Sequence, residues 1–196
     1  SFPALLKASA HSSAMMEYLD QTSSRRGNIN ENYAREIMEL HSVGVDGGYT
    51  QQDVNELARV LTGWTVSGCG LFTYDAALHD FGPKRVLGKT ISATATAGGL
   101  AGKAEADAVI DTLALHPNTA RYVAGKLCRF LLQYDPTDAI VQAVATEFTR
   151  TKGNIPSMIR VILTEQNLMA APPKYKRPYH FATSAVRALG PSVTSV

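Results

Sequence analysis

The clearest helical pattern in the chain runs from Thr50 to Gly63. Its apolar residues recur at the three- and four-residue spacing that builds one face of an α-helix, at Val54, Leu57, Ala58 and Leu61. Thr50 and Asp53, three positions later, form a variant capping box that marks the helix start. The pattern predicts an amphipathic helix over residues 50–63, whose buried face is extended by Trp64.

A second helical pattern precedes it over residues 30–42. Asn30 is a favourable cap for its start, and Gly44 is a favourable residue for its end. At about 100° per residue, one side of this helix carries an apolar set that includes a histidine, namely Tyr33, Ala34, Ile37, Met38, Leu40 and His41. Because only a short glycine-rich turn separates the two patterns, we predict that residues 30–42 and 50–63 pack as an antiparallel hairpin.

Further helices and one small β element are predicted in the rest of the chain. Helical spacing returns over residues 3–20, from Lys103 to Pro117, and in four later segments that end at Gly190. Glycines and β-favouring residues predict a small β-hairpin or ordered loop near 70–91. We expect a flexible loop at 92–102 and an extended linker at 170–177. The predicted fold class is all-α, with one multi-helical domain over residues 1–196.

Composition and charge exclude several protein classes. With 196 residues, of which 45% are hydrophobic and 18% charged, the chain can bury a single core. A formal net charge of +2 is too small for the basic stripe of a nucleic-acid-binding protein, and no apolar run reaches the roughly 18 residues of a membrane-spanning helix. We therefore expect no nucleic-acid partner and no transmembrane segment in this chain.

Motifs that define common enzyme classes are missing from the sequence. There is no G-x-S-x-G elbow, Walker loop, dinucleotide fingerprint or HExxH pair. Cys69 and Cys128 are too few and too far apart to define a zinc site or a disulfide framework, so two buried free thiols and a single bridge both remain open. The turn Asp46-Gly47-Gly48 looks superficially like a calcium loop but lacks oxygen ligands at alternate positions. We predict no metal and no cofactor.

Seven polar residues near the predicted hairpin form a candidate functional cluster: Glu36, His41, Asp46, Arg59, His79, Asp80 and Lys84. A histidine on an apolar face, as predicted for His41, is either a core residue with a hydrogen-bond partner or a catalytic group. The segment after Trp64 is long enough to run back along the hairpin. We therefore predict one polar neighbourhood that contains His41, Asp46, Arg59, His79 and Asp80.

The irregular segment that carries His79, Asp80 and Lys84 is the better functional candidate, because loops commonly hold functional side chains. Asp80 can pair with Arg59 in a structural role. The other alternative is a metal that would need ligands from elsewhere, such as Glu36.

One basic and aromatic cluster lies near the C-terminal end, formed by Lys174, Tyr175, Lys176, Arg177, Tyr179 and His180. Its cations are too few on one face for nucleic-acid binding, so we interpret it as a solvated linker.

Four stretches of the sequence resemble the bacterial family catalogued as domain of unknown function 1800. They are NENYAREIMELH followed by GVDGGYTQ and ELARVLTGW, then LHDFGPKRVLGKTI, LALHPNTARYVAGKL and KYKRPYHFATSAVRALG, in the order of the family. The second stretch contains the HD-x-G-x-K pattern of the family at His79, Asp80 and Lys84. The resemblance implies an exported, extracytoplasmic, largely helical protein that is longer than this chain, and it implies no activity.

Two functions are compatible with these observations. The first is an interaction or scaffold module that binds a protein partner or the remainder of its own longer chain. The alternative is a hydrolase-like enzyme or a metal-dependent protein that uses the seven-residue polar cluster. A solvent-open cleft lined by these residues would favour the enzyme, and a closed network would favour the scaffold.

Overall fold

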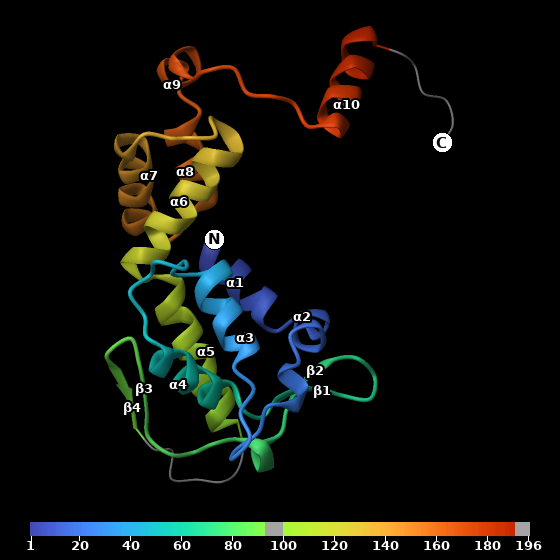
Figure 1. The fold of residues 1–196 in the computed structure, drawn as a ribbon, viewed down its shortest axis with the longest axis vertical. Coiled ribbons are helices and arrows are strands. Elements are labelled where there is room, and N and C mark those ends of the chain that lie inside the picture. Colours follow the sequence, from blue (N-terminus) through green and yellow to red (C-terminus); the bar gives the residue numbers. More distant parts are fainter. Residues whose placement is uncertain (93–99, 191–196) are drawn as a thin grey trace.

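The computed structural model describes residues 1–92 and 100–190 and arranges them in two lobes (Figure 1). Among these residues, the N-terminal lobe is built from α1 (Phe2–Ala10), α2 (Ser13–Tyr18), α3 (Asn32–Glu36), α4 (Gln51–Leu61) and α5 (Ala101–Ala114). The second lobe consists of α6 (Pro117–Leu131), α7 (Asp138–Thr151) and α8 (Ile155–Ile162). Beyond it follow α9 (Glu165–Ala170) and α10 (Pro178–Leu189). The mainly helical class is confirmed, but two small sheets make all-α only an approximate description.

Each lobe buries its own apolar cluster. Tyr33 and Trp64 are among the largest buried side chains of the first cluster, and Phe148 and Met158 of the second. Phe2 packs against both clusters, and its backbone N–H donates to the Gly153 carbonyl at 2.7 Å. The two lobes are therefore joined by α1 as well as by the α5–α6 connection.

The amphipathic helix predicted after Thr50 is confirmed as α4. Thr50 Oγ1 accepts a hydrogen bond from the Asp53 N–H at 3.2 Å, and Asp53 Oδ2 accepts one from the Thr50 N–H at 2.8 Å. This reciprocal pair is the predicted capping box. The predicted inward face is fully buried at Val54, Leu57, Ala58, Leu61 and Trp64. α3 packs against α4, while the antiparallel geometry of the pair stays a prediction.

The helix that precedes α4 in the chain, α3, continues into a π-helical segment, η2 (Ile37–His41). A π turn contains one more residue than an α turn, so the directions of the side chains after Ile37 differ from those of a regular α-helix. Ile37 and Met38 are buried as predicted, whereas Leu40 is 54% exposed and His41 is half-buried. The prediction of an inward-facing Leu40 was therefore wrong.

Two antiparallel pairs of strands replace the single β-hairpin predicted near 70–91. β1 (Trp64–Val66) pairs with β2 (Phe72–Tyr74), and β3 (Lys84–Val86) pairs with β4 (Lys89–Ile91). Each strand pairs with its neighbour in sequence, and Leu87 and Gly88 take φ of 48° and 77° and close β3 directly onto β4. Short 3-10 turns, η1 (Gln21–Ser23) and η3 (Ala76–Leu78), complete the lobe.

The predicted loop at 92–102 lies largely outside the described residues, except that Ala101 and Gly102 already belong to α5. Residues 171–177 contain no helix or strand and connect α9 to α10, close to the predicted linker. Both cysteines are free thiols: Cys128 is buried in the second lobe, whereas Cys69 is exposed, contrary to the expectation of two buried thiols.

Candidate functional site

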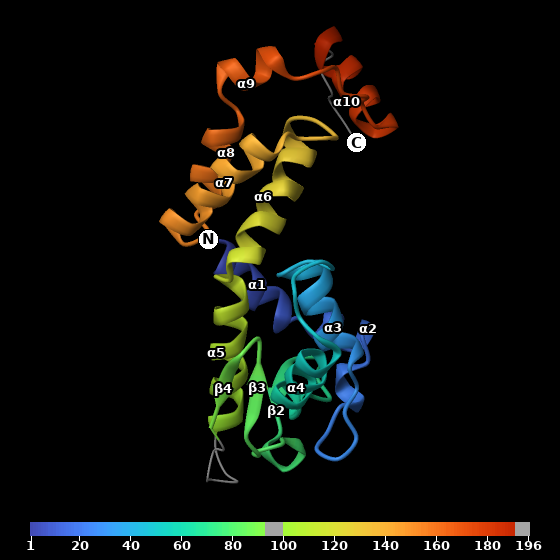
Figure 2. The ribbon, with the colours of Figure 1, turned by 60° about the vertical axis from the view of Figure 1, so that its left-hand side comes forward.

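A buried ion pair connects β3 to α5. Lys84 Nζ donates to Glu105 Oε1 at 2.7 Å, and the two side chains are 0% and 4% exposed. β3 also lies beside α4 (Figure 2). The loss of one member of such a pair leaves an uncompensated buried charge, which is strongly destabilising. The pair therefore ties the segment after His79 to a helix that follows it in the chain.

His79 extends this buried network from the loop before β3. Its ring is fully buried, with Nδ1 2.6 Å from the Thr62 carbonyl oxygen and Nε2 3.8 Å from Glu105 Oε1. A carbonyl only accepts hydrogen bonds, so Nδ1 carries the hydrogen and Nε2 faces the carboxylate. Burial favours a higher pKa for Glu105, but the neighbouring His79 ring and Lys84 ammonium outweigh burial and lower the pKa. Glu105 is therefore ionised at neutral pH.

The glycine at position 102 allows α5 to approach this histidine closely. A Cβ at Gly102 would collide with the Tyr74 hydroxyl and would lie 2.7 Å from His79 Nε2. Burial raises the pKa of Tyr74 to about 12, so its hydroxyl is protonated at neutral pH. Within the described residues, Tyr74 Oη, His79 Nε2 and Glu105 Oε2 lack a hydrogen-bond partner. One imidazole nitrogen and two oxygens of neighbouring side chains are therefore buried here without a hydrogen-bond partner.

A second group of charges surrounds Arg59 on α4. Arg59 Nε donates to Asp80 Oδ2 at 2.8 Å, and Nη1 donates to the Glu56 oxygens at 3.0 and 2.9 Å. Burial favours a higher pKa for Asp80, but the hydrogen bonds from Arg59 and from the Gly82 N–H outweigh burial and lower the pKa. The structure therefore forms the Asp80–Arg59 pair that the sequence offered as one alternative.

Carboxylates of α4 also hold the β3–β4 hairpin through its backbone. The Arg85 N–H donates to Glu56 Oε2 at 3.0 Å, and the Leu87 N–H donates to Asp53 Oδ1 at 2.7 Å. The same Asp53 caps the start of α4. The segment after Trp64 therefore does run back along α4, as the sequence predicted.

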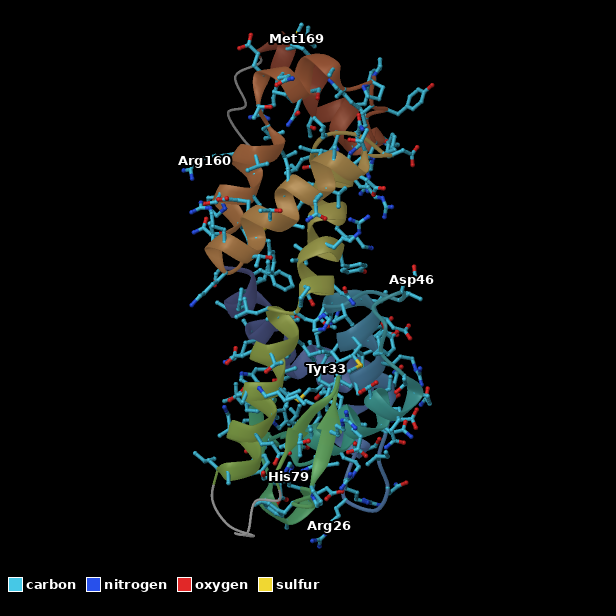
Figure 3. The ribbon with its side chains drawn as sticks, turned by 90° about the vertical axis from the view of Figure 1, so that its left-hand side faces the viewer. Arg26, Tyr33, Asp46, His79, Arg160 and Met169 are labelled. Atoms are coloured by element: carbon cyan, nitrogen blue, oxygen red, sulfur yellow. The ribbon has the colours of Figure 1, made fainter. Side chains whose placement is uncertain are left out.

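The structure brings Arg59, His79, Asp80 and Lys84 together, but it leaves Glu36, His41 and Asp46 out of the network. Asp46 is exposed on the turn that leads to the N-terminal end of α4, and Figure 3 shows it far from His79. His79 contacts Thr62, at the opposite end of this helix. Eleven helical residues span about 16 Å, which separates the two groups. The expectation of one neighbourhood that includes His41 and Asp46 is therefore corrected.

Glu36 lies at the end of α3 and His41 at the end of η2. Burial lowers the pKa of His41, and the charge of Glu36 partly opposes this effect. The backbone on either side of His41 approaches α6. Asn118 Nδ2 donates to the Gly47 carbonyl at 2.7 Å, and Tyr122 Oη donates to the Leu40 carbonyl at 3.2 Å. The end of η2 and the turn that follows it therefore contact the second lobe.

The side chains of His79, Lys84 and Glu105 are closed to solvent, at 0%, 0% and 4% exposed. A groove of about 630 Å³ runs outside them, lined by residues of α4 and of the β3–β4 hairpin that include two of the seven candidates, Arg59 and Lys84. His79 and Glu105 do not line this groove. The arrangement can hold a segment rigidly, but it does not present the imidazole to a substrate.

A comparison with family models assigns the chain to a protein family. The model described as "Protein of unknown function (DUF1800)" matches residues 1–196, the whole chain. The chain belongs to this family. No curated protein and no solved structure matches it. The description of DUF1800 gives no activity, so a functional proposal rests on the structure.

Two features are absent from the described part of this DUF1800 chain, a metal-binding cluster and a membrane-spanning helix. Over residues 1–92 and 100–190, no group of three or more His, Cys, Asp or Glu side chains is placed to hold a metal ion. None of the helices in these ranges is long and apolar enough to cross a bilayer.

Sequence reasoning missed Glu105, the central residue of the network. Glu105 lies four residues before Val109, at the margin of the apolar face of α5. A carboxylate at that spacing is the signal that could have indicated a buried partner for Lys84, but it does not identify which cation it meets. Tyr74 and Thr62 were missed because their roles depend on contacts distant in sequence.

A second partly buried polar group, also missed, surrounds His11 at the end of α1. Its ring packs against both Trp64 and Phe72, with centroid distances of 4.8 and 4.5 Å, and its Nε2 is 2.8 Å from Asp107 Oδ1. Burial lowers the pKa of His11 despite the opposing effect of Asp107. This group fastens α1 to α5 and to the first sheet.

Proposed function

We propose that this chain is a helical interaction module, in which a rigid N-terminal lobe supports a C-terminal surface that binds a protein partner. The observation that carries the proposal is the solvent exposure of α10. Among the residues described, α10 has no buried side chain, and Figure 1 shows it standing apart from α6, α7 and α8. A helix with one apolar face normally buries that face against another element.

The apolar face of α10 is continuous. Projection at about 100° per residue places Tyr179, Phe181, Val186 and Leu189 on one half of the helix and His180, Thr183, Ser184 and Arg187 on the other. The four apolar side chains are 76%, 66%, 49% and 83% exposed, in that order. Contiguous exposed apolar surface of this kind marks sites of interaction.

The closed polar network supports the scaffold rather than the enzyme. His79, Lys84 and Glu105 are buried and joined to one another, so they are suited to holding the β3–β4 hairpin between α4 and α5. A hydrolase-like or metal-dependent reaction at this cluster has less support, because the imidazole does not reach the outer groove. We also propose an extracytoplasmic location for this module, on the basis of the family resemblance alone.

Site-specific photo-crosslinking in the source cells tests the proposal. A photoreactive residue replaces Phe181 on the open face of α10, and the control replaces Arg160, an exposed residue of α8 in the second lobe (Figure 3). We expect a covalent adduct with another protein from position 181 and none from position 160. The absence of an adduct at 181, or equal adducts at both positions, would contradict the proposal. A crosslink within the same chain would assign the face to the remainder of a longer chain.

A further inference from the structure

A basic groove lies between the C-terminal half of α6 and the segment that leads into α10. It has a volume of about 560 Å³ and is lined by six groups that are cationic or can become so, Lys126, Arg129, Lys174, Lys176, Arg177 and His180. No Asp or Glu lines it. The whole chain carries a formal net charge of only +2, so this groove concentrates positive charge that is balanced elsewhere.

The positive charge of the groove is not neutralised locally. Over residues 1–92 and 100–190, the ion pairs formed by Lys and Arg do not include Lys126, Arg129, Lys176 or Arg177. The sequence from 166 to 196 contains no acidic residue. Clustered cations without partners repel one another and attract a negatively charged ligand.

The groove is held in shape by specific contacts. Lys174 Nζ donates to the carbonyls of Arg129 and of Phe130, the latter at 2.7 Å, near the C-terminal end of α6. The same ammonium lies 4.9 Å from the centroid of the Tyr134 ring, and Tyr134 Oη donates to the Tyr175 carbonyl at 3.0 Å. Lysine at a helix C-terminus satisfies free carbonyls and favours the helix dipole. These contacts dock the basic segment on α6.

Apolar surface continues from the groove onto α10. Phe130, Tyr134 and Tyr175 line the groove and are 62%, 51% and 89% exposed. The open apolar face of α10 begins at Tyr179, two residues after the last cation of the basic segment. The groove therefore adjoins the first turn of α10 through His180, on the polar half of that helix, and the uncovered apolar face begins one residue earlier, at Tyr179.

We propose that this combined surface binds an acidic, amphipathic polypeptide segment. The inference rests on the proposed function and specifies the chemistry of the partner. Carboxylates of the segment pair with Arg129, Lys176 and Arg177, while its apolar side chains cover the face of α10. Arginine favours bidentate pairing with carboxylates, and complementary charge determines the orientation and specificity of docking.

A polypeptide fits these observations better than other polyanions. A nucleic-acid strand could stack its bases on the groove aromatics, but it would leave the aliphatic side chains Val186 and Leu189 in water. An anionic lipid surface would cover the face of α10, but a broad bilayer surface does not enter a groove between a helix and a peptide segment. Only a segment with both carboxylates and apolar side chains matches both parts of the surface.

Binding of a designed peptide to the folded chain tests the inference. The probe is a fluorescent amphipathic helix of Glu and Leu of about 15 residues, the length below which isolated helices become marginal in water. A matched peptide carries Gln in place of Glu. Because hydrogen bonds to charged groups contribute strongly to binding, we expect the Glu peptide to bind at least about tenfold more tightly and to weaken as salt is added.

Two triple variants with equal loss of charge separate a specific groove from a general charge effect. The groove variant combines Arg129→Gln, Lys176→Gln and Arg177→Gln. The control combines Arg25→Gln, Arg26→Gln and Arg160→Gln, exposed residues outside the groove, of which Figure 3 labels Arg26 and Arg160. We expect the groove variant to lose about tenfold or more in affinity and the control to bind like the unaltered chain. Circular dichroism verifies that both remain folded.

Several outcomes would overturn the inference. These are no binding of the Glu peptide at low salt, equal weakening in both triple variants, or tighter binding of phosphatidylglycerol vesicles or oligodeoxythymidylate that only the groove variant loses. The crosslink from position 181 keeps the two proposals distinct. If it forms equally well in the groove variant, a protein still docks on α10, but its recognition does not depend on acidic residues.

Discussion

The buried Lys84–Glu105 pair gives the sharpest test of how the N-terminal lobe is held together. We consider the substitution Glu105→Leu, which keeps a similar side-chain volume and removes the carboxylate. The Lys84 ammonium, fully buried in the native fold, then has no counter-ion. Removing one member of a buried pair costs about 3–5 kcal/mol of unfolding free energy.

A double substitution separates charge from packing. Lys84→Met added to Glu105→Leu removes both charges and leaves apolar side chains in their place. Replacement of a whole buried pair by apolar residues is often neutral or stabilising. The double variant is therefore expected within about 1 kcal/mol of the unaltered chain or above it.

The chain provides a control with the same geometry and different burial. Lys7 and Asp111 also lie 2.7 Å apart, but their side chains are 33% and 50% exposed. Asp111→Asn should cost about 0–1 kcal/mol, because exposed pairs are screened by water. Urea unfolding followed by circular dichroism measures all variants. If Glu105→Leu costs no more than Asp111→Asn, burial does not control the strength of the pair and the reasoning is refuted.

Three further perturbations test other parts of the structure. Gly102→Ala places a Cβ against the tyrosine hydroxyl and the imidazole and should cost about 1–3 kcal/mol, whereas Gly125→Ala, with open space around it, should stabilise its helix by about 0.5–1 kcal/mol; equal effects in urea unfolding would contradict the close packing. Leu61→Ala should cost about 2–5 kcal/mol and Leu40→Ala less than about 0.5 kcal/mol, because only the first side chain is buried; a reversed order in thermal unfolding would mean that the π-helical turn is misplaced. Asp80 has a lowered pKa in the folded state, so its stabilising contribution is present above its unfolded pKa and is lost as pH falls through the folded value. Asp80→Asn should therefore be less stable than the unaltered chain at pH 7, and the difference should vanish in acid; a difference that persists below the ordinary pKa range of aspartate would exclude this linkage.

Local sequence features correctly predicted the element that organises the site. The capping box of Thr50 and Asp53 and the spacing of Leu57 and Leu61 depend on residues within one or two helical turns, so the bounds and the buried face of α4 follow from the sequence. The β-favouring runs were recognised, but their pairing was not. The conformation of Leu87 decided that pairing, and positive φ at a leucine has no clear sequence signal.

The sequence predicted only those contacts of the candidate site that involve α4. The pairing of Arg59 with Asp80 could be predicted from the sequence. Arg59 lies on the exposed side of α4, and a segment that runs back along this helix passes that side. The directions of Leu40 and His41 could not be predicted, since a π turn changes side-chain positions without changing the apolar spacing.

The sequence by itself determined the mainly helical fold, the buried face of α4 and the presence of charged side chains near residue 80. Tertiary structure alone decided which charges meet. Lys84 on β3 and Glu105 on α5 lie 21 positions apart, and the sequence around either residue does not identify the other as its partner. Their pairing depends on how α5 packs against α4 and β3, because burial makes an ion pair strong only after the surrounding elements have excluded water.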